Sequence, residues 1–135
     1  MLVYPLNSIL LGHVESRSDV DICESCLRSL LSLSYVDSVS LWLGPSIPLL
    51  LSFLVPPYLT RDCLRYSLEI ISNLCVQVGN RGAIAREGGV EALVALHGDA
   101  EDVVRDLSFR IVRHLQDATP HEVVLTLKKN IGALI

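Results

Sequence analysis

Aromatic and charged side chains are both scarce in this chain of 135 residues. Phe, Trp and Tyr together make up 5% of it and Asp, Glu, Lys and Arg 19%, whereas hydrophobic residues make up 50%. An average soluble domain carries more charge, about 25%. The core must therefore be built from Leu, Ile and Val. The excess of apolar residues implies either that a partner covers much of the surface or that the chain is a piece of a longer array.

Positive charge is also limited, which bears on the class of partner. The chain has 11 Lys and Arg against 15 Asp and Glu, giving a net charge of −4. Lys128 and Lys129 are the only adjacent basic pair. Because nucleic-acid binding needs a basic face, we expect no nucleic-acid partner.

No complete motif for catalysis or metal binding occurs in the sequence. Cys23-Glu-Ser-Cys26 has the spacing of half a structural zinc site, but no second C-x-x-C or H-x-x-x-H supplies the other two ligands. The four histidines are scattered, and neither H-E-x-x-H nor G-x-S-x-G is present. We therefore predict buried structural cysteines, no cofactor or metal, and no enzymatic activity.

Two features bear on the compartment and on membranes. Residues 1–11 are apolar but lack the basic start of a secretory signal, so the four cysteines are expected to be reduced, in the cytoplasm or nucleus. Residues 39–55 are very apolar, yet Gly44, Pro45 and Pro48 interrupt them. The uninterrupted part is about half of the roughly 20 residues that a spanning helix needs. We therefore expect a buried helix there and no membrane insertion.

An internal repeat organises the chain. Residues 47–53 resemble residues 90–96, at an offset of 43. Residues 27–33, 68–74 and 109–115 resemble one another in two steps of 41. A period of this length with only helical patterns falls in the range of armadillo and HEAT units.

The longest segments have clear helical patterns and start signals. In residues 61–76 and 103–115 the apolar positions follow the spacing of one helical face. Thr60 and Asp99 are placed to cap these two helices, and residues 119–122 have the spacing of a capping box for a C-terminal helix.

Residues 80–96 carry the clearest resemblance to a known family. This run resembles the armadillo unit, with a short first helix, a Gly88-Gly89 corner, a second helix and then a long third helix. The corner requires glycine because the chain turns sharply there. Small residues at one aligned place, Cys26, Ser67 and Ser108, fit the close helix packing of the family. HEAT repeats are the alternative.

The resemblance implies an all-α fold, a right-handed α-solenoid of about three armadillo-like helical repeats. It covers one domain, residues 1–135. The expected units are residues 1–35, 36–78 and 79–117, followed by a C-terminal capping helix, 119–135.

The long third helices of such a stack line a curved surface, and its outward rows follow from the repeat. Arg28, Glu69 and Arg110 align, and so do the residues four positions later, Ser32, Asn73 and His114. Residues four apart share a helical face. A third row, Glu24, Arg65 and Asp106, alternates in charge and predicts ion pairs between repeats. The candidate partner-binding residues are Arg28, Arg65, Glu69, Asn73, Arg110 and His114.

In armadillo proteins that bind extended peptides, these rows hold tryptophan and asparagine. Here Asn73 keeps the asparagine, but Glu69 stands in place of a tryptophan. The resemblance therefore does not imply binding of a basic signal peptide. For each polar side chain of the rows, a solvated position on an exposed helix is the competing interpretation.

Two functions follow as hypotheses. The preferred one is a protein–protein interaction module or adaptor, which binds a protein or peptide segment on the concave face. The alternative is a structural subunit of a homo-oligomer or larger assembly, a HEAT-like scaffold that docks through its apolar surface. The side chains expected at that surface are Trp42, Leu43, Leu49, Leu50 and Leu51.

Overall fold

The computed structural model describes residues 17–117, and this part of the chain is entirely helical, without a β-strand. The all-α class is therefore confirmed for these residues. Its helices are α2 (Arg17–Ser34), α3 (Asp37–Trp42), α4 (Ile47–Ser52), α5 (Arg61–Leu74), α6 (Val78–Arg86), α7 (Gly89–Ala95) and α8 (Asp102–Asp117). Two 3₁₀ turns, η2 (Gly44–Ser46) and η3 (Leu96–Gly98), precede α4 and follow α7. The expected start of the first unit, residues 1–16, and the expected capping helix, 119–135, lie outside the described residues.

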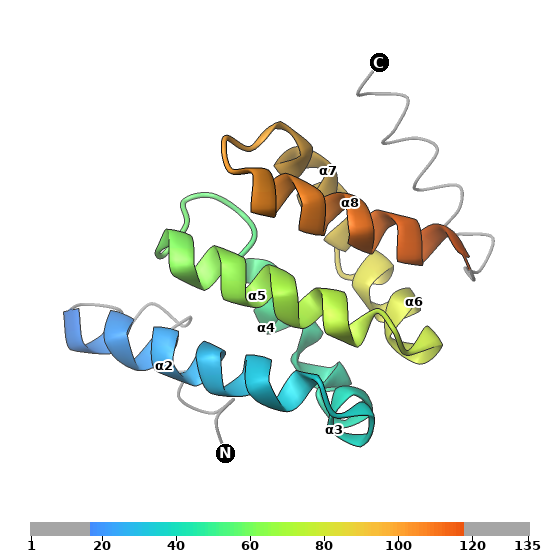
Figure 1. Ribbon diagram of the computed structural model, residues 1–135, viewed down its shortest axis with the longest axis horizontal. Helices are drawn as coiled ribbons and strands as arrows, with labels where there is room; N and C mark the ends of the chain where they lie inside the picture. The colour runs from blue at the N-terminus through green and yellow to red at the C-terminus, as the bar shows by residue number, and fades with distance from the viewer. Residues whose placement is uncertain (1–16, 118–135) are drawn as a thin grey trace.

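The three long helices lie side by side in one layer and run in the same direction (Figure 1). In this long-helix layer, defined by α2, α5 and α8, α2 packs on α5 and α5 packs on α8. The short helices lie behind it, where α4 packs on α5 and α6, and α7 packs on α8. Each long helix after the first therefore follows two shorter ones, as the repeat predicts.

The core is aliphatic, as the shortage of aromatic residues requires. Phe53 is the one aromatic side chain buried in it among residues 17–117. The apolar stretch 39–55 forms α3, η2 and α4, and no helix of the described part is long and apolar enough to cross a membrane. The largest fully buried side chains are Leu27, Leu43, Ile47, Leu50, Leu54, Leu64, Leu68, Ile70, Ile71, Leu74 and Ile84.

The predicted glycine corner is present between α6 and α7. Gly88 has φ +84°, a conformation that residues with a Cβ rarely adopt. Gly89 is required for a different reason, because a Cβ there would lie 2.4 Å from the carbonyl oxygen of Ile84. Glycine is thus required at position 88 by the backbone conformation and at position 89 by close packing.

The predicted caps differ from each other in the structure. The Thr60 hydroxyl accepts a hydrogen bond from the backbone N–H of Cys63 at 3.0 Å, so Thr60 caps α5. Asp99 instead accepts from the backbone N–H of Glu101 at 2.9 Å, in the turn before α8 begins. The prediction that Asp99 caps α8 itself is therefore wrong, because the chain makes one more turn before the helix.

The alignment of residues 27–33, 68–74 and 109–115 predicts equivalent buried sites for their last residues, Leu33, Leu74 and Leu115, and one of these three predictions is wrong. Leu74 and Leu115 are fully buried, but Leu33, at the equivalent place in α2, is 42% exposed. Ser34 is the buried residue there. Thus α2 ends with its serine, not its leucine, turned toward α5. The small residues Cys26 and Ser108 are buried as predicted, and so is Ser67.

Candidate partner-binding surface

The six candidate residues all lie on the long-helix layer. Arg28 belongs to α2, three residues belong to α5, and two belong to α8. Arg28 and Arg110 are exposed, whereas the other four are half-buried. The half-buried ones are Arg65, Glu69, Asn73 and His114.

Glu69 is tied to the end of the neighbouring helix. The Tyr35 hydroxyl, just past α2, donates a 2.9 Å hydrogen bond to Oε1 of Glu69. This bond raises the pKa of Tyr35 above its usual value, because it is made to a carboxylate. Tyr35 could not be found from the repeat, because it lies in a turn, beyond the helical spacing that aligns the other residues.

Asn73 lies one helical turn further along α5, beside the same junction. Its Nδ2 donates a 2.8 Å hydrogen bond to the hydroxyl of Ser34, and that hydroxyl donates to the carbonyl of Leu31 at 2.7 Å. A hollow of about 140 Å³ opens here, lined by Asn73, Ser34, Tyr35, Asp37 and Val76. Asn73 therefore joins two consecutive long helices and also borders an accessible hollow.

Arg28 contacts the next long helix through an aromatic ring. Its Cζ lies 5.8 Å from the centroid of the Tyr66 ring in α5. This is within the range of a cation–π contact, which contributes about 0.5–1 kcal/mol at exposed sites. The guanidinium is thus positioned on the layer but keeps its exposure to solvent.

The ion pairs predicted along the row of Glu24, Arg65 and Asp106 are not formed. Arg65 instead pairs with Asp62, one turn earlier in α5, and its Nη1 lies 3.9 Å from Oε2 of Glu101. Glu24 accepts a 2.8 Å hydrogen bond from the hydroxyl of Thr60. The prediction failed because helix starts and loops, closer to these charges than the next helix, supply the partners.

A stronger cross-repeat contact begins at Arg61, which the sequence did not single out. Its Nη2 lies 2.6 Å from Oδ1 of Asp99, and its Nε lies 2.7 Å from Oε1 of Glu101. The guanidinium lowers the pKa of Asp99. This network connects the start of α5 to the turn before α8.

Arg110 and His114 are the uncommitted members of the candidate set. Neither forms a hydrogen bond or an ion pair with the residues of 17–117, and Arg113, exposed beside them, forms none either. Within the described part of the chain, the α8 end of the layer thus has two guanidinium groups and an imidazole without a polar partner.

The cysteines are buried and unpaired, as expected. Cys23 and Cys63 lie against each other, and the hydrogen bond between their thiols raises the pKa of Cys23. Burial raises the pKa of Cys75 to about 12. Within residues 17–117, no group of three or more His, Cys, Asp or Glu side chains is placed to hold a metal ion. Cys23 and Cys26 therefore have no partners for a metal site there.

The apolar surface expected for a docked subunit is mostly internal. Trp42 is 61% exposed, but Leu43, Leu50 and Leu51 are buried in the core of the chain itself, and Leu49 is half-buried. The sequence could not separate them because all five are apolar and adjacent. Other exposed apolar side chains occur near the ends of α2, α3 and α5, namely Tyr35, Val36, Leu41, Val76 and Val78.

No protein-family model and no curated protein matches the sequence. Among solved structures, the chain is similar to an engineered protein from the Northeast Structural Genomics Consortium, with a TM-score of 0.75 and 16% sequence identity. The match covers 97% of this chain and 51% of the engineered protein, so the chain spans about half its length. At this identity the likeness concerns the fold alone.

Proposed function

We propose that the chain is a short, right-handed armadillo-like solenoid that binds a protein or peptide segment along the long-helix layer. The observation that carries the proposal is the parallel, side-by-side packing of α2, α5 and α8 (Figure 1). Such packing repeats equivalent positions at regular intervals across a surface, which suits an extended or helical partner. The repeat in the sequence and the glycine corner before α7 support the armadillo assignment.

The anchors of this binding differ in kind along the layer. At the α8 end, Arg110 and His114 would pair with acceptors on the partner, since neither forms a hydrogen bond or an ion pair within residues 17–117. At the α2–α5 junction, Glu69 accepts a hydrogen bond from Tyr35 and Asn73 donates one to Ser34. Asn73 also borders the hollow. Arg28, in α2, and Arg65, in α5, add two further polar side chains to the layer. Binding then comes from shape and a few polar anchors, and the role is that of an adaptor, not an enzyme.

The chemistry of the chain supports an intracellular setting for this adaptor. Its four cysteines are unpaired and buried, which suits the reducing conditions of the cytoplasm or nucleus. Its net charge of −4 supports a protein partner over a nucleic acid.

The test begins with affinity purification from native cells and mass spectrometry to identify the partner. Titration of the purified partner should then show that Arg110→Ala and His114→Ala each weaken binding by about 1 kcal/mol or more. The matched control is Arg86→Ala, since Arg86 is exposed at the end of α6, outside the layer. Helicity and Tm should stay unchanged in all three. Equal affinity of the two layer variants and the wild type would refute the proposal, as would an equal loss for the control.

A structural subunit is the second candidate, and the exposed side chains of Leu41 and Trp42 favour it. Here α3 would dock against a neighbouring copy or another subunit. This candidate predicts that the isolated chain self-associates and that Trp42→Ser reduces the association. Light scattering over a concentration series decides it, because a monomer at every concentration excludes self-assembly.

A further inference from the structure

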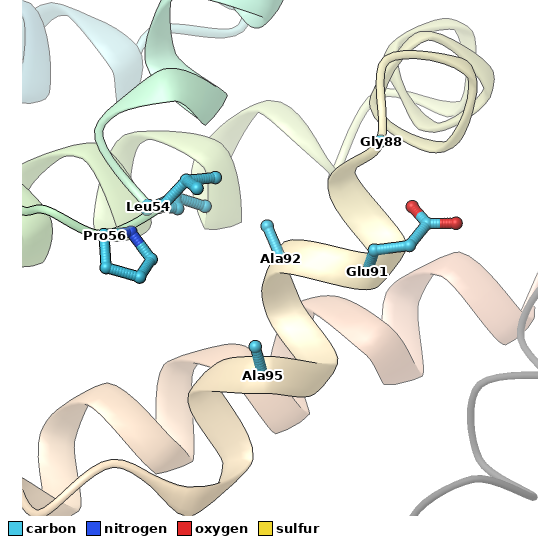
Figure 2. Close-up of a pocket in the computed structure, with 7 residues that line it drawn as sticks. Leu54, Pro56, Gly88, Glu91, Ala92 and Ala95 are labelled. Atoms are coloured by element: carbon cyan, nitrogen blue, oxygen red, sulfur yellow. The ribbon is translucent and has the colours of Figure 1, made fainter.

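A second hollow lies away from the long-helix layer, between α7 and the segment that follows α4. Its volume is about 240 Å³ and its lining is mostly apolar. Figure 2 shows the side chains of Ala92 and Ala95 on the side of α7 that faces Leu54 and Pro56. We call this hollow the α7 groove, and its lining residues are Leu54, Val55, Pro56, Gly88, Glu91, Ala92 and Ala95.

The groove exists because α7 presents small residues at successive turns. At the offset of 43 residues, Ala92 corresponds to Leu49 of α4, so a leucine-sized side chain is missing from this repeat. Of its lining residues, Leu54 is buried, whereas Val55 is 51% exposed. The groove is therefore an apolar site with part of its lining open to solvent.

A carboxylate marks one rim of the groove. A Cβ built on Gly88 would lie 3.9 Å from Oε2 of Glu91, which places this carboxylate beside the glycine corner. Glu91 forms no hydrogen bond or ion pair with residues of the described part, and Glu87, just before the corner, is exposed and equally uncommitted. An anionic group at this rim would be repelled, and a cationic one attracted.

We propose that the α7 groove receives one aliphatic side chain of a partner protein, of leucine size, followed by a lysine or arginine that pairs with Glu91. Pockets for drug-sized ligands span about 300–1,000 Å³, so a volume of about 240 Å³ suits a single side chain better. The apolar lining selects the aliphatic group, and the uncompensated rim charge selects the basic neighbour. The site is separate from the long-helix layer and does not depend on the function proposed for it.

The test uses two dipeptide probes, acetyl-Leu-Lys-amide and acetyl-Leu-Glu-amide, with the full chain labelled at its alanine methyl groups. The lysine probe, added to about 10 mM, should shift the NMR signals of Ala92 and Ala95, with a Kd in the millimolar range. The glutamate probe should bind about fivefold more weakly or worse, and added salt should narrow the difference. Unmoved signals, or equal affinities for the two probes, would overturn the proposal.

Variants assign the binding to the groove. Ala95 is exposed, so Ala95→Leu fills the mouth without disturbing the core and should weaken the lysine probe about tenfold. Glu91→Gln should make the two probes bind alike, and Ser29→Ala, at an exposed position of α2, should leave the affinity of both probes unchanged. Retained binding by Ala95→Leu would disprove the location.

A dilution series without probe tests the main rival occupant. If the signals of Ala92 and Ala95 move with protein concentration alone, a second copy of the chain fills the groove and the proposal of a separate partner fails. Constant signals support the proposal.

Discussion

The side-chain amide of Asn73, in α5, donates a 2.8 Å hydrogen bond to the hydroxyl of Ser34, the last residue of α2. The serine hydroxyl in turn donates to the carbonyl of Leu31. Three groups from two consecutive long helices thus form one chain of hydrogen bonds. Asn73 was selected from the sequence as a surface anchor for a partner, but it also connects the repeats.

The first prediction follows from this double role. Asn73→Ala should lower the free energy of unfolding by about 1 kcal/mol, the typical net contribution of one hydrogen bond. Urea unfolding followed by circular dichroism measures it. Ser32→Ala is the control, since Ser32 is exposed and bonds only to a carbonyl of its own helix. If Asn73→Ala is as stable as the wild type, the hydrogen bond from Asn73 to Ser34 does not stabilise the packing of α2 on α5.

The glycine corner gives a second prediction with an internal control. Gly89→Ala places a Cβ 2.4 Å from the carbonyl oxygen of Ile84 and 2.5 Å from its Cγ2, so backbone must move. We expect a loss of about 2–4 kcal/mol, the range of severe packing defects. Gly79→Ala, in α6, meets no atom within 4 Å and should be neutral or stabilising by up to about 1 kcal/mol. Equal stability of the two variants in urea would contradict the corner.

The features predicted correctly from the sequence are local ones. Gly88 was assigned to a corner because a positive φ is a property of one residue and its neighbours. The helical face predicted for residues 61–76 is clear because the helix there, α5 (Arg61–Leu74), packs on both flanks, so its apolar residues repeat strongly.

The features predicted wrongly, the burial of Leu33 and the polar partners of Glu69 and Arg65, depend on which residues of other segments lie nearby. Leu33 is exposed because α2 offers its serine, not its leucine, to α5 at that end, a choice that the aligned spacing does not reveal. The partners of Glu69 and Arg65 were missed because Tyr35 lies beyond a helix end and Glu101 lies before one. Periodicity places residues along a helix, but it does not place the turns around them.

A third prediction concerns Asn80, a buried residue in the first turn of α6, close to the end of α5. Its Nδ2 donates to the carbonyl of Leu74 at 3.0 Å and to that of Ser40 at 3.2 Å, joining the end of α5 to α3. Asn80→Asp keeps the shape but removes both donors and faces a carboxylate toward the carbonyls. We expect a loss of about 2–4 kcal/mol at neutral pH, because each unpaired buried group costs about 1–3 kcal/mol.

Urea unfolding measures the loss in free energy of unfolding for Asn80→Asp. The control is Glu87→Gln, which also exchanges a carboxylate and an amide but at an exposed position. The control should stay within about 0.5 kcal/mol of the wild type, as surface substitutions usually do. A similarly small change in Asn80→Asp would mean that water replaces the lost donors and that the contact does not hold α3 in place.

The last prediction is a dependence of stability on pH through His97. This residue lies in η3, and its ring stacks on that of Phe109, with centroids 3.9 Å apart and planes 16° apart. Both ring nitrogens are buried without a hydrogen-bond partner among the described residues. Burial lowers the pKa of His97, because the protonated ring loses its hydration there.

The sign of the effect follows from proton binding. An unfolded histidine takes up a proton near pH 6.5, whereas folded His97 does so only at lower pH. The unfolded state therefore binds more protons just below this value, and stability that is complete above about pH 6.5 declines as the pH falls. His97→Phe keeps a stacked ring without a titrating group, so its stability should fall less than that of the wild type between about pH 7.5 and pH 5.5. His114→Gln, changed at a half-buried position on α8, should keep the wild-type slope. Urea unfolding at several pH values measures all three, and parallel curves for His97→Phe and the wild type would show that the buried imidazole does not control acid stability.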